Sequence, residues 1–382
     1  MKGHRIFVLA LAAVVLGASF AVGFELRARS LAQPVAAPPP APLRAQVLSD
    51  LRAHYYRALP AAAFRATTVA GMIRALKDPY TRYLPPNAYD QLRNAETGSY
   101  SGVGLALARE QRGLRVTASF PGFPGRQAGI RPGDVITTID GTSLASLSYR
   151  RALNLIGGRA GSRMQLRVVR PGHAHPLSLT LVRRPIALPY VSSHLIRFRG
   201  LRVCVIRLLG FPATAGARVR AIAERASRRH EPVILDLRGN PGGLLSQAVA
   251  VVRVFARSGV VVTTRGLHEP ARQFVADDTA VGRLRLAVLI NGGTASAAEV
   301  VAGALHADAG AVVVGRPSYG KGTVQAVEPL AGGGALKLTV ARFTLRGGLV
   351  VEGRGISPTI MVDARPGPSD RVLLAALRAL RR

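Results

Sequence analysis

One serine in this chain is expected at the point where a strand gives way to a helix, a position suited to nucleophilic chemistry. The segment 291–299, NGGTASAAE, follows the apolar run Leu286–Ile290, and we expect a helix from Ala295 to Leu305. A hydroxyl at a helix N-terminus lies beside unpaired backbone amides, which can stabilise the oxyanion formed when Ser296 attacks a carbonyl carbon. Capping the helix is the commoner role of such a serine, so this segment alone leaves both roles open.

A serine nucleophile needs a base to accept its proton. The eight histidines do not stand in a pattern that resembles a Ser–His–Asp triad. Lysine is the alternative, because burial can lower its pKa towards neutrality, whereas arginine keeps its proton. Lysines are scarce in this arginine-rich chain, and Lys321 lies in the glycine-lined segment 318–325, SYGKGTVQ, after the apolar strand Val312–Val314. Lys321 is therefore the candidate base.

The same segment partly matches a phosphate-binding loop. Residues 315–321 fit the first seven positions of the pattern G-x-x-x-x-G-K-[ST] and follow a predicted strand. However, Gly322 stands where a magnesium-binding Ser or Thr is needed, and the strand-like run 323–327 replaces the helix that would hold phosphate. The sequence therefore argues against nucleotide binding.

The elements that position these residues fall into three regions. Residues 44–97 show helical spacing, with breaks at Pro60 and at Asp78-Pro79, and residues 98–184 show short alternating strands separated by Pro-Gly and Asp-Gly turns. Residues 185–365 alternate strands and helices, which is typical of a mixed, mostly parallel α/β sheet. We expect its strands at 201–208, 232–237, 286–290 and 311–315, its helices at 215–229, 248–255 and 295–305, and glycine-rich β segments at 336–345 and 349–351.

The β-rich region 98–184 contains a glycine-rich turn that could bind a carboxylate. In YSGVGL, residues 100–105, exposed amides can hold an anion, and the adjoining strand edge can accept a peptide strand. The later segments 127–136, QAGIRPGDVI, and Ile139–Gly141 complete a pattern that resembles the PDZ domains of bacterial proteases. The resemblance implies that a substrate's terminal carboxylate binds at Ser101, Gly102, Val103, Gly104 and Leu105.

The order of the motifs resembles the carboxy-terminal processing (tail-specific) protease family. Ser296 is followed by Glu299, and Lys321 is followed by Gln325, as in that family. The resemblance extends from about residue 44 to 365 and includes KDPYTRYL at 77–84, VILDLRGNPGG at 233–243, ALKLTVARF at 335–343 and GRGISP at 353–358.

This resemblance implies a role for each matched residue in a serine endopeptidase without cofactor or metal. Ser296 would be the nucleophile and Lys321 the general base, with Gln325 orienting the lysine. The backbone amides of Ala297 and Gly242 would form the oxyanion hole.

The chain also departs from the family pattern. Ala298 replaces a usual serine, and Ala307, between His306 and Asp308, stands where the family commonly has Asp. Asp236 and Arg238 are expected to be structural. A non-catalytic PDZ scaffold or partner-binding protein on the same fold is the alternative interpretation.

The N-terminal region predicts export. Lys2, His4 and Arg5 precede the apolar stretch Ile6–Phe24, which is about long enough to cross a bilayer at ~20 residues. We therefore expect a signal peptide or membrane anchor at 1–25 and a Pro/Ala linker at 26–43. The expected location is periplasmic or otherwise extracytoplasmic, and anchoring in the inner membrane is left open.

The net charge of +32 is carried almost wholly by arginine. The arginines are scattered and Trp is absent, which argues against stacking platforms for nucleic acid and favours a solvated basic surface. Residues 366–382 are expected to form a basic C-terminal tail. The expected partners are proteins or peptides with free C-termini, and a homo-oligomer or an adaptor is left open.

Overall fold

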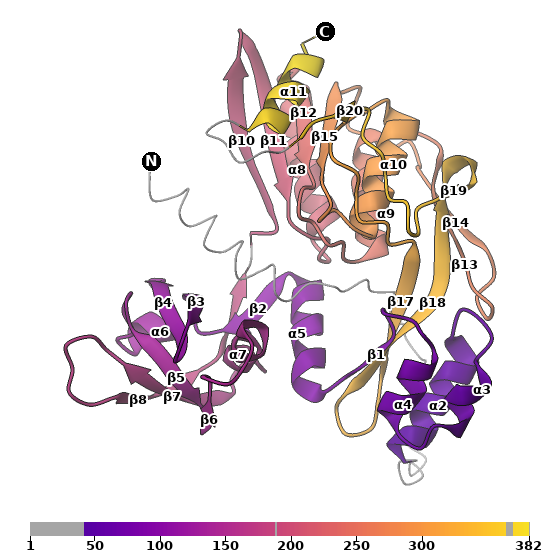
Figure 1. Ribbon diagram of the computed structural model, residues 1–382. Coiled ribbons are helices and arrows are strands. Elements are labelled where there is room, and N and C mark those ends of the chain that lie inside the picture. Colours follow the sequence, from indigo (N-terminus) through magenta and orange to yellow (C-terminus); the bar gives the residue numbers. More distant parts are fainter. Residues whose placement is uncertain (1–41, 188, 364–369, 382) are drawn as a thin grey trace, which may run out of the picture. The chain divides into compact units, whose positions relative to one another are not determined.

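The computed structural model describes residues 42–187, 189–363 and 370–381, which divide into two compact units (Figure 1). Within these residues, the core unit contains 42–84 and everything from 189 onwards, and the second unit contains 85–187. The expected signal or anchor segment and nearly all of the linker lie outside the described residues. No helix within the described ranges is long and apolar enough to cross a bilayer.

The core unit is built on the predicted mostly parallel sheet, with strand order β10-β11-β12-β15-β16-β20. Only β10 is antiparallel to its neighbour. The central strands β12 and β15 are buried along their whole length, which explains why their sequences are continuous apolar runs rather than alternating ones. The strands are β10 (Val191–Phe198), β11 (Leu201–Leu208), β12 (Val233–Asp236), β15 (Leu286–Ile290), β16 (Val312–Gly315) and β20 (Ile360–Met361).

Helices cover both faces of this sheet (Figure 1). The helices α8 (Ala215–Arg228), α9 (Leu245–Phe255) and α10 (Ala297–Ala309) share one apolar cluster with alternate strand residues such as Ile206, Leu235 and Val288. The other strand residues, such as Val205 and Ile234, pack against α11 (Arg371–Ala379).

Helix α11 lies in the segment that the sequence indicated only as a basic tail. Its apolar face, which includes Val372, Ala376 and Leu377, is buried in the second cluster. An ion pair between Arg238 and Asp370, at 2.9 Å, joins the start of this helix to the loop after β12. The sequence analysis interpreted this segment from its arginines and so missed a short amphipathic helix.

A second sheet in the core unit is centred on β18 (Ala335–Leu345). This strand pairs with segments from very different parts of the chain: β1 (Arg82–Leu84), β13 (Val260–Arg265), β17 (Thr323–Pro329) and β19 (Leu349–Val350), with β14 (Arg272–Val275) beyond β13. Because β1 is paired with β18, the N-terminal segment is folded into the core unit.

The helices before β1 belong to this core as well. They are α2 (Leu43–His54), α3 (Ala61–Arg65) and α4 (Val69–Ala75), and Val47 and Leu51 share the main apolar cluster with Leu338. The predicted break at Pro60 is present. A further break separates α3 from α4, where the Thr68 side chain accepts a hydrogen bond from the Gly71 amide.

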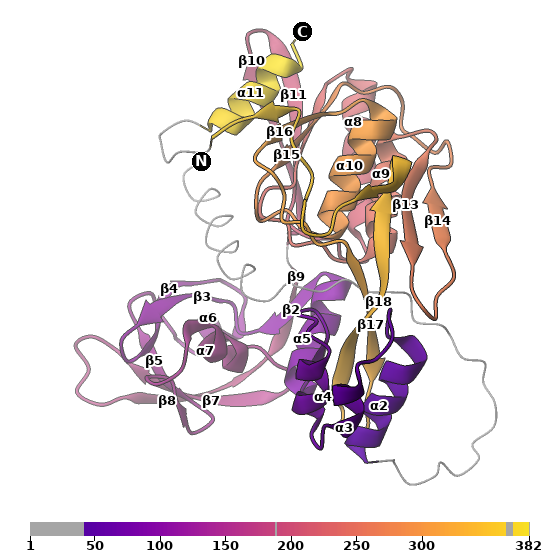
Figure 2. The same cartoon turned by 45° about the vertical axis from the view of Figure 1, so that its right-hand side comes forward.

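The second unit contains the predicted β-rich domain (Figure 2). Its main sheet has the order β3-β4-β5-β7-β8, with β6 beside β5, and a separate β2–β9 pair joins the two ends of the domain. Helix α5, which the sequence grouped with the N-terminal helices, belongs to this unit. The elements are α5 (Pro86–Thr97), β2 (Ser99–Gly102), β3 (Leu105–Glu110), β4 (Gly113–Ser119), α6 (Pro124–Gln127), β5 (Val135–Ile139), β6 (Thr142–Ser143), α7 (Tyr149–Ile156), β7 (Arg163–Val169), β8 (Leu177–Val182) and β9 (Arg184–Ala187).

Candidate active site

Ser296 lies in a tight turn between β15 and α10, as its position in the sequence predicts. It is the N-cap residue of α10, whose first residue is Ala297, and its backbone has φ 56° and ψ −118°. A non-glycine residue at positive φ is strained, and such strain is often found at functional sites. The side chain is buried, with 1% of its surface exposed. The turn therefore holds a buried hydroxyl in a conformation that a simple capping serine does not need.

The loop after β12 packs directly against this turn. The Ala295 amide donates to the Asn240 carbonyl at 2.9 Å, and the Thr294 hydroxyl donates to the Leu237 carbonyl at 2.9 Å. A Cβ atom on Gly242 would lie 3.1 Å from the Ser296 Cβ, and φ of Gly242 is +104°. A side chain at this position would press against the serine turn and would be strained by the positive φ, so glycine is favoured there.

The backbone amides expected to form an oxyanion hole differ in whether they already donate a hydrogen bond. The Gly242 amide donates to the Asn240 side-chain oxygen at 2.9 Å. By contrast, the amides of Ala297 and Gly243 donate to no acceptor among the described residues. In the loop after β12, the Gly242 amide is thus already satisfied and the Gly243 amide is available.

The carboxylate of Glu299 connects the serine turn to the lysine loop. One oxygen accepts from the amides of Ser296 and Lys321, at 2.7 and 2.9 Å. The other accepts from the Ser318 hydroxyl and the Gly320 amide, at 2.5 and 2.7 Å. Glu299 is completely buried, and this burial raises its pKa, while the four donors act in the opposite direction by stabilising the anion.

Lys321 is buried as the candidate base should be, with 1% of its surface exposed. Its pKa is lowered to about 8, chiefly because burial penalises the ammonium form and also because of the Arg82 charge. The charges of Glu352, Asp78 and Glu299 act against this shift. At neutral pH an appreciable fraction of Lys321 can therefore be the free amine.

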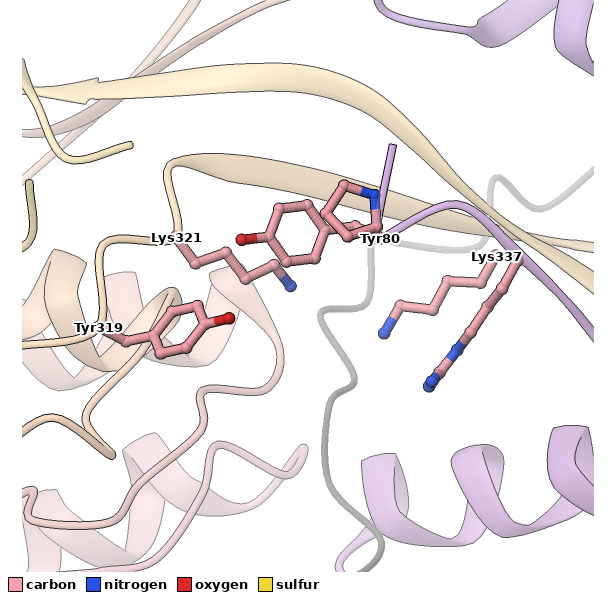
Figure 3. A pocket seen from close by; sticks show the side chains of 6 residues that line it. Tyr80, Tyr319, Lys321 and Lys337 are labelled. Atoms are coloured by element: carbon pink, nitrogen blue, oxygen red, sulfur yellow. The ribbon is translucent and has the colours of Figure 1, made fainter. Parts of the chain in front are cut away.

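The Lys321 amine lies over an aromatic ring and beside a cavity (Figure 3). Its Nζ is 4.9 Å from the centre of the Tyr80 ring. A pocket of about 190 Å³ adjoins it, lined by Pro79, Tyr80, Arg82, Tyr319, Lys321 and Lys337.

Gln325 lies on β17, shortly after Lys321, and is fully buried. Its Nε2 donates to the Thr323 hydroxyl at 2.9 Å. Its Oε1 is buried and accepts no hydrogen bond from the described residues. An unsatisfied buried acceptor is costly, which suggests that Gln325 has a partner in another state of the site.

Other polar residues near these motifs have structural partners. Asp308 pairs with Arg346 at 2.6 Å, and His306 Nδ1 lies 3.0 Å from the Ala311 carbonyl oxygen. Asp236 forms ion pairs with Arg207 and Arg238, which agrees with a structural role. The connecting roles of Glu299 and Asn240 were not foreseen, since their partners lie in loops that only the fold brings together.

The PDZ-like loop belongs to the other unit. Ser101, Gly102, Val103, Gly104 and Leu105 are all buried, and the Ser101 hydroxyl has no hydrogen-bond partner among the described residues. Gly104 has φ +71°, and a Cβ atom there would lie 2.1 Å from the Phe123 Cβ. Glycine at 104 is thus required by the loop's own packing, so substituting it would change the loop as well as any ligand site.

We expect Glu299→Gln to impair both stability and catalysis. The amide would point a donor at backbone N–H groups, which should lower the free energy of unfolding by about 3 kcal/mol. Small shifts of the two loops should lower kcat at least ~100-fold with little change in KM. Urea unfolding and peptide-cleavage kinetics measure these effects. Glu224→Gln, at a half-buried position on α8, is the matched control and should behave as wild type. Wild-type stability and kcat in Glu299→Gln would contradict the connecting role.

Comparisons with known proteins identify the family of each unit. The family model described as Peptidase family S41 matches residues 202–362, and the PDZ domain model matches residues 115–170. The chain is 34% identical over 304 residues to the carboxy-terminal-processing protease of Bartonella bacilliformis, covering 77% of this chain and 68% of that protein. It is also 34% identical over 301 residues to the carboxyl-terminal-processing protease of Synechocystis sp., covering 78% and 70%.

A solved structure gives the same result. The photosystem II D1 C-terminal processing protease is 27% identical, with a TM-score of 0.54, and the match covers 88% of this chain and 96% of that one. The chain therefore belongs to the carboxy-terminal processing proteases of peptidase family S41, which are serine proteases, and it carries a PDZ domain.

Proposed function

We propose that this protease cleaves exported proteins with a Ser–Lys dyad, Ser296 and Lys321, after its PDZ domain has bound their C-terminal tails. The main support for this dyad is that the Glu299 carboxylate accepts hydrogen bonds from the backbone amides of both residues. The strained backbone of Ser296 and the lowered pKa of Lys321 support the same assignment. A scaffold without catalysis would have no use for these features.

The proposed reaction follows from the chemistry of the two side chains. The free amine of Lys321 accepts the proton of the Ser296 hydroxyl while Oγ forms a bond to the scissile carbonyl carbon. When the C–N bond breaks, the Lys321 ammonium returns the proton to the leaving amine, and the acyl-enzyme remains. Lys321 then accepts a proton from the water that attacks the ester carbonyl carbon, and it returns that proton to Oγ as the C–O bond breaks and Ser296 is released.

The oxyanion of each tetrahedral intermediate needs donors fixed in advance. We assign one to the Ala297 amide and the second to the Gly242–Gly243 pair. The Gly242 amide was the expected donor, but it now donates to Asn240, whereas the Gly243 amide is available. Gln325 would orient Lys321, and its unsatisfied Oε1 is suited to accept a hydrogen bond from the ammonium form.

The substrate tail would be bound by the PDZ domain. We propose that the backbone amides of residues 102–105 hold the terminal carboxylate and that the tail adds a strand to the domain. Export by the apolar segment 6–24, with or without retention at the inner membrane, stays a prediction from the sequence, and so does any oligomer or adaptor.

Removal of either dyad residue should abolish cleavage. Ser296→Ala and Lys321→Ala should each reduce kcat/KM by at least ~10³-fold, and the double variant should be no worse than either one, because the residues act as a unit. Lys321→Arg should also be inactive, since arginine keeps its proton. Cleavage of a tailed fluorogenic peptide measures this, with the exposed Ser193→Ala as control. More than a few per cent activity in Lys321→Ala would exclude the lysine as base.

The pH profile should report the ionisation of Lys321. Only the free amine can accept the serine proton, so kcat/KM should rise with pH and reach half of its maximum near the pKa of about 8. Initial rates between pH 6 and 10 test this, with circular dichroism confirming that the protein stays folded. An activity that falls from pH 6 to 9 in the folded protein would contradict the mechanism.

Tail recognition should depend on the terminal carboxylate. The inactive Ser296→Ala variant should bind a labelled peptide with a free C-terminus at least ~10-fold more tightly than the same peptide with a C-terminal amide, because charge-assisted hydrogen bonds are lost. Fluorescence anisotropy gives both affinities. The comparison changes only the ligand and so avoids the distortion that a side chain at Gly104 would cause. Equal affinities would exclude carboxylate recognition by this loop.

A further inference from the structure

A buried row of side-chain hydroxyls connects Gln325 to the turn that precedes β1. Strand β18 has β17 along one edge and β1 along the other, because residues 335–337 pair with both. Thr339 lies just beyond this stretch and is the register partner of Gln325 on β17. The Thr339 amide donates to the Thr81 hydroxyl oxygen at 3.1 Å. All three side chains are at most 2% exposed, so their polar groups depend on one another rather than on water.

The hydroxyl protons of this row have one direction that satisfies every contact. The Thr81 hydroxyl lies 2.6 Å from Asp78 Oδ2, and a carboxylate can only accept, so Thr81 donates its single proton there. The hydroxyl oxygens of Thr81 and Thr339 are 3.4 Å apart. Thr81 can then only accept in this contact, so the Thr339 proton is directed to Thr81. We call Asp78, Thr81 and Thr339 the threonine network.

This direction determines which way the side-chain amide of Gln325 is turned. Its Nε2 lies 2.9 Å from the Thr323 hydroxyl oxygen and 3.4 Å from that of Thr339. A rotated amide would place Oε1 against the Thr339 oxygen, whose only proton is already used, and the two acceptors would repel one another. The NH₂ group therefore stays on the side of the threonines. Oε1 is buried and accepts no hydrogen bond from the described residues, so the network fixes an unused acceptor.

The first residue of the network also shapes the surroundings of Lys321. The other Asp78 oxygen accepts from the Tyr80 amide at 2.9 Å, and the Tyr80 ring lies against the Lys321 amine, 4.9 Å from its Nζ. The negative charge of Asp78 acts on the pKa of Lys321, as expected of neighbouring groups. The turn that begins the network therefore lies beside the lysine that Gln325 would orient.

We propose that the threonine network positions the base of the reaction, by holding Gln325 so that Oε1 accepts a hydrogen bond from the Lys321 amine when substrate is bound. The inference rests on the proposed function, in which Lys321 takes the proton of Ser296. An amine that donates one N–H to a fixed oxygen keeps its lone pair in a restricted direction, ready for the serine hydroxyl. The three residues of the network are thus positioning residues that act through Gln325.

The first test removes one hydroxyl and keeps the shape of the side chain. Thr339→Val should lower kcat about 10-fold and leave KM within about twofold, because peptide binding in the ground state does not use the network. Thr339→Ser restores the hydroxyl and should keep at least about half of the wild-type kcat. Thr344→Val, at a half-buried position of the same strand, is the matched control. Cleavage of the tailed fluorogenic peptide by the full-length protein gives these values.

A double variant separates positioning from a general effect on the fold. Thr339→Val combined with Gln325→Ala should be no slower than Gln325→Ala alone, because the network acts only through the amide. An independent structural role would multiply the two losses. Thr81→Val breaks the network at its other hydroxyl. It should give the same kinetic results, and it serves as the test if Thr339→Val does not fold.

The pH profile gives a readout that loosened packing would not reproduce. An acceptor beside the amine stabilises the ammonium form, so the loss of Oε1 should lower the pKa of Lys321. In Thr339→Val the half-maximum of kcat/KM should therefore move about 0.5 pH below that of wild type. Water entering a loosened site would move it upwards, towards the ordinary value of a lysine. The substitution keeps the charged and titratable neighbours of Lys321, which are Arg82, Glu352, Asp78, Glu299, Lys337, Tyr80 and Tyr319.

Three results would overturn the inference: wild-type kcat in both Thr339→Val and Thr81→Val, a further loss in the double variant, or a half-maximum that moves to higher pH. Failure of the proposed function looks different, because Ser296→Ala or Lys321→Ala would then still cleave the peptide. If those two variants are inactive and both network variants cleave like wild type, the dyad stands and only the role of the network is wrong.

Discussion

The candidate site depends on a single buried carboxylate. Glu299 projects from the first turn of α10 and accepts hydrogen bonds from the serine turn on one side and from the 318–321 loop on the other. A carboxylate without exposed surface is stable only when its donors are in place, so the two loops and the anion stabilise one another. The backbone amides of Ser296 and Lys321 are therefore held by the same carboxylate oxygen.

The parallel sheet explains why these loops meet at all. The strands β12, β15 and β16 are adjacent and parallel, so the loops that follow them emerge at the same edge of the sheet. The first carries Gly242, the second carries Ser296 and the third carries Lys321. Hydrogen bonds between them, such as those from Ala295 to Asn240 and from Tyr319 to Thr294, fix their spacing. Three short sequence motifs become one site because their strands are neighbours.

Much of this arrangement could be predicted from the sequence. The buried strands are short apolar runs, so strands such as Leu201–Leu208 and Leu286–Ile290 have the predicted limits. Ser296 and Lys321 stand out because a helix start and a scarce lysine are visible locally. The connecting role of Glu299 could not be deduced, since it accepts from residues about twenty positions away. The pairing of β1 with β18 and the burial of α11 were also missed, because neither depends on a local pattern.

The β1–β18 pairing has a consequence for the time at which the enzyme becomes active. A ribosome makes Arg82 long before it makes Lys337, and a whole PDZ domain and most of the parallel sheet are synthesised between them. Contacts between such distant segments form late, after the closure of a long loop. The pocket around the lysine lacks one wall until β18 has been made, so a partly synthesised chain would hold Ser296 beside an incomplete site. A complete wall around Lys321 therefore requires nearly the entire polypeptide.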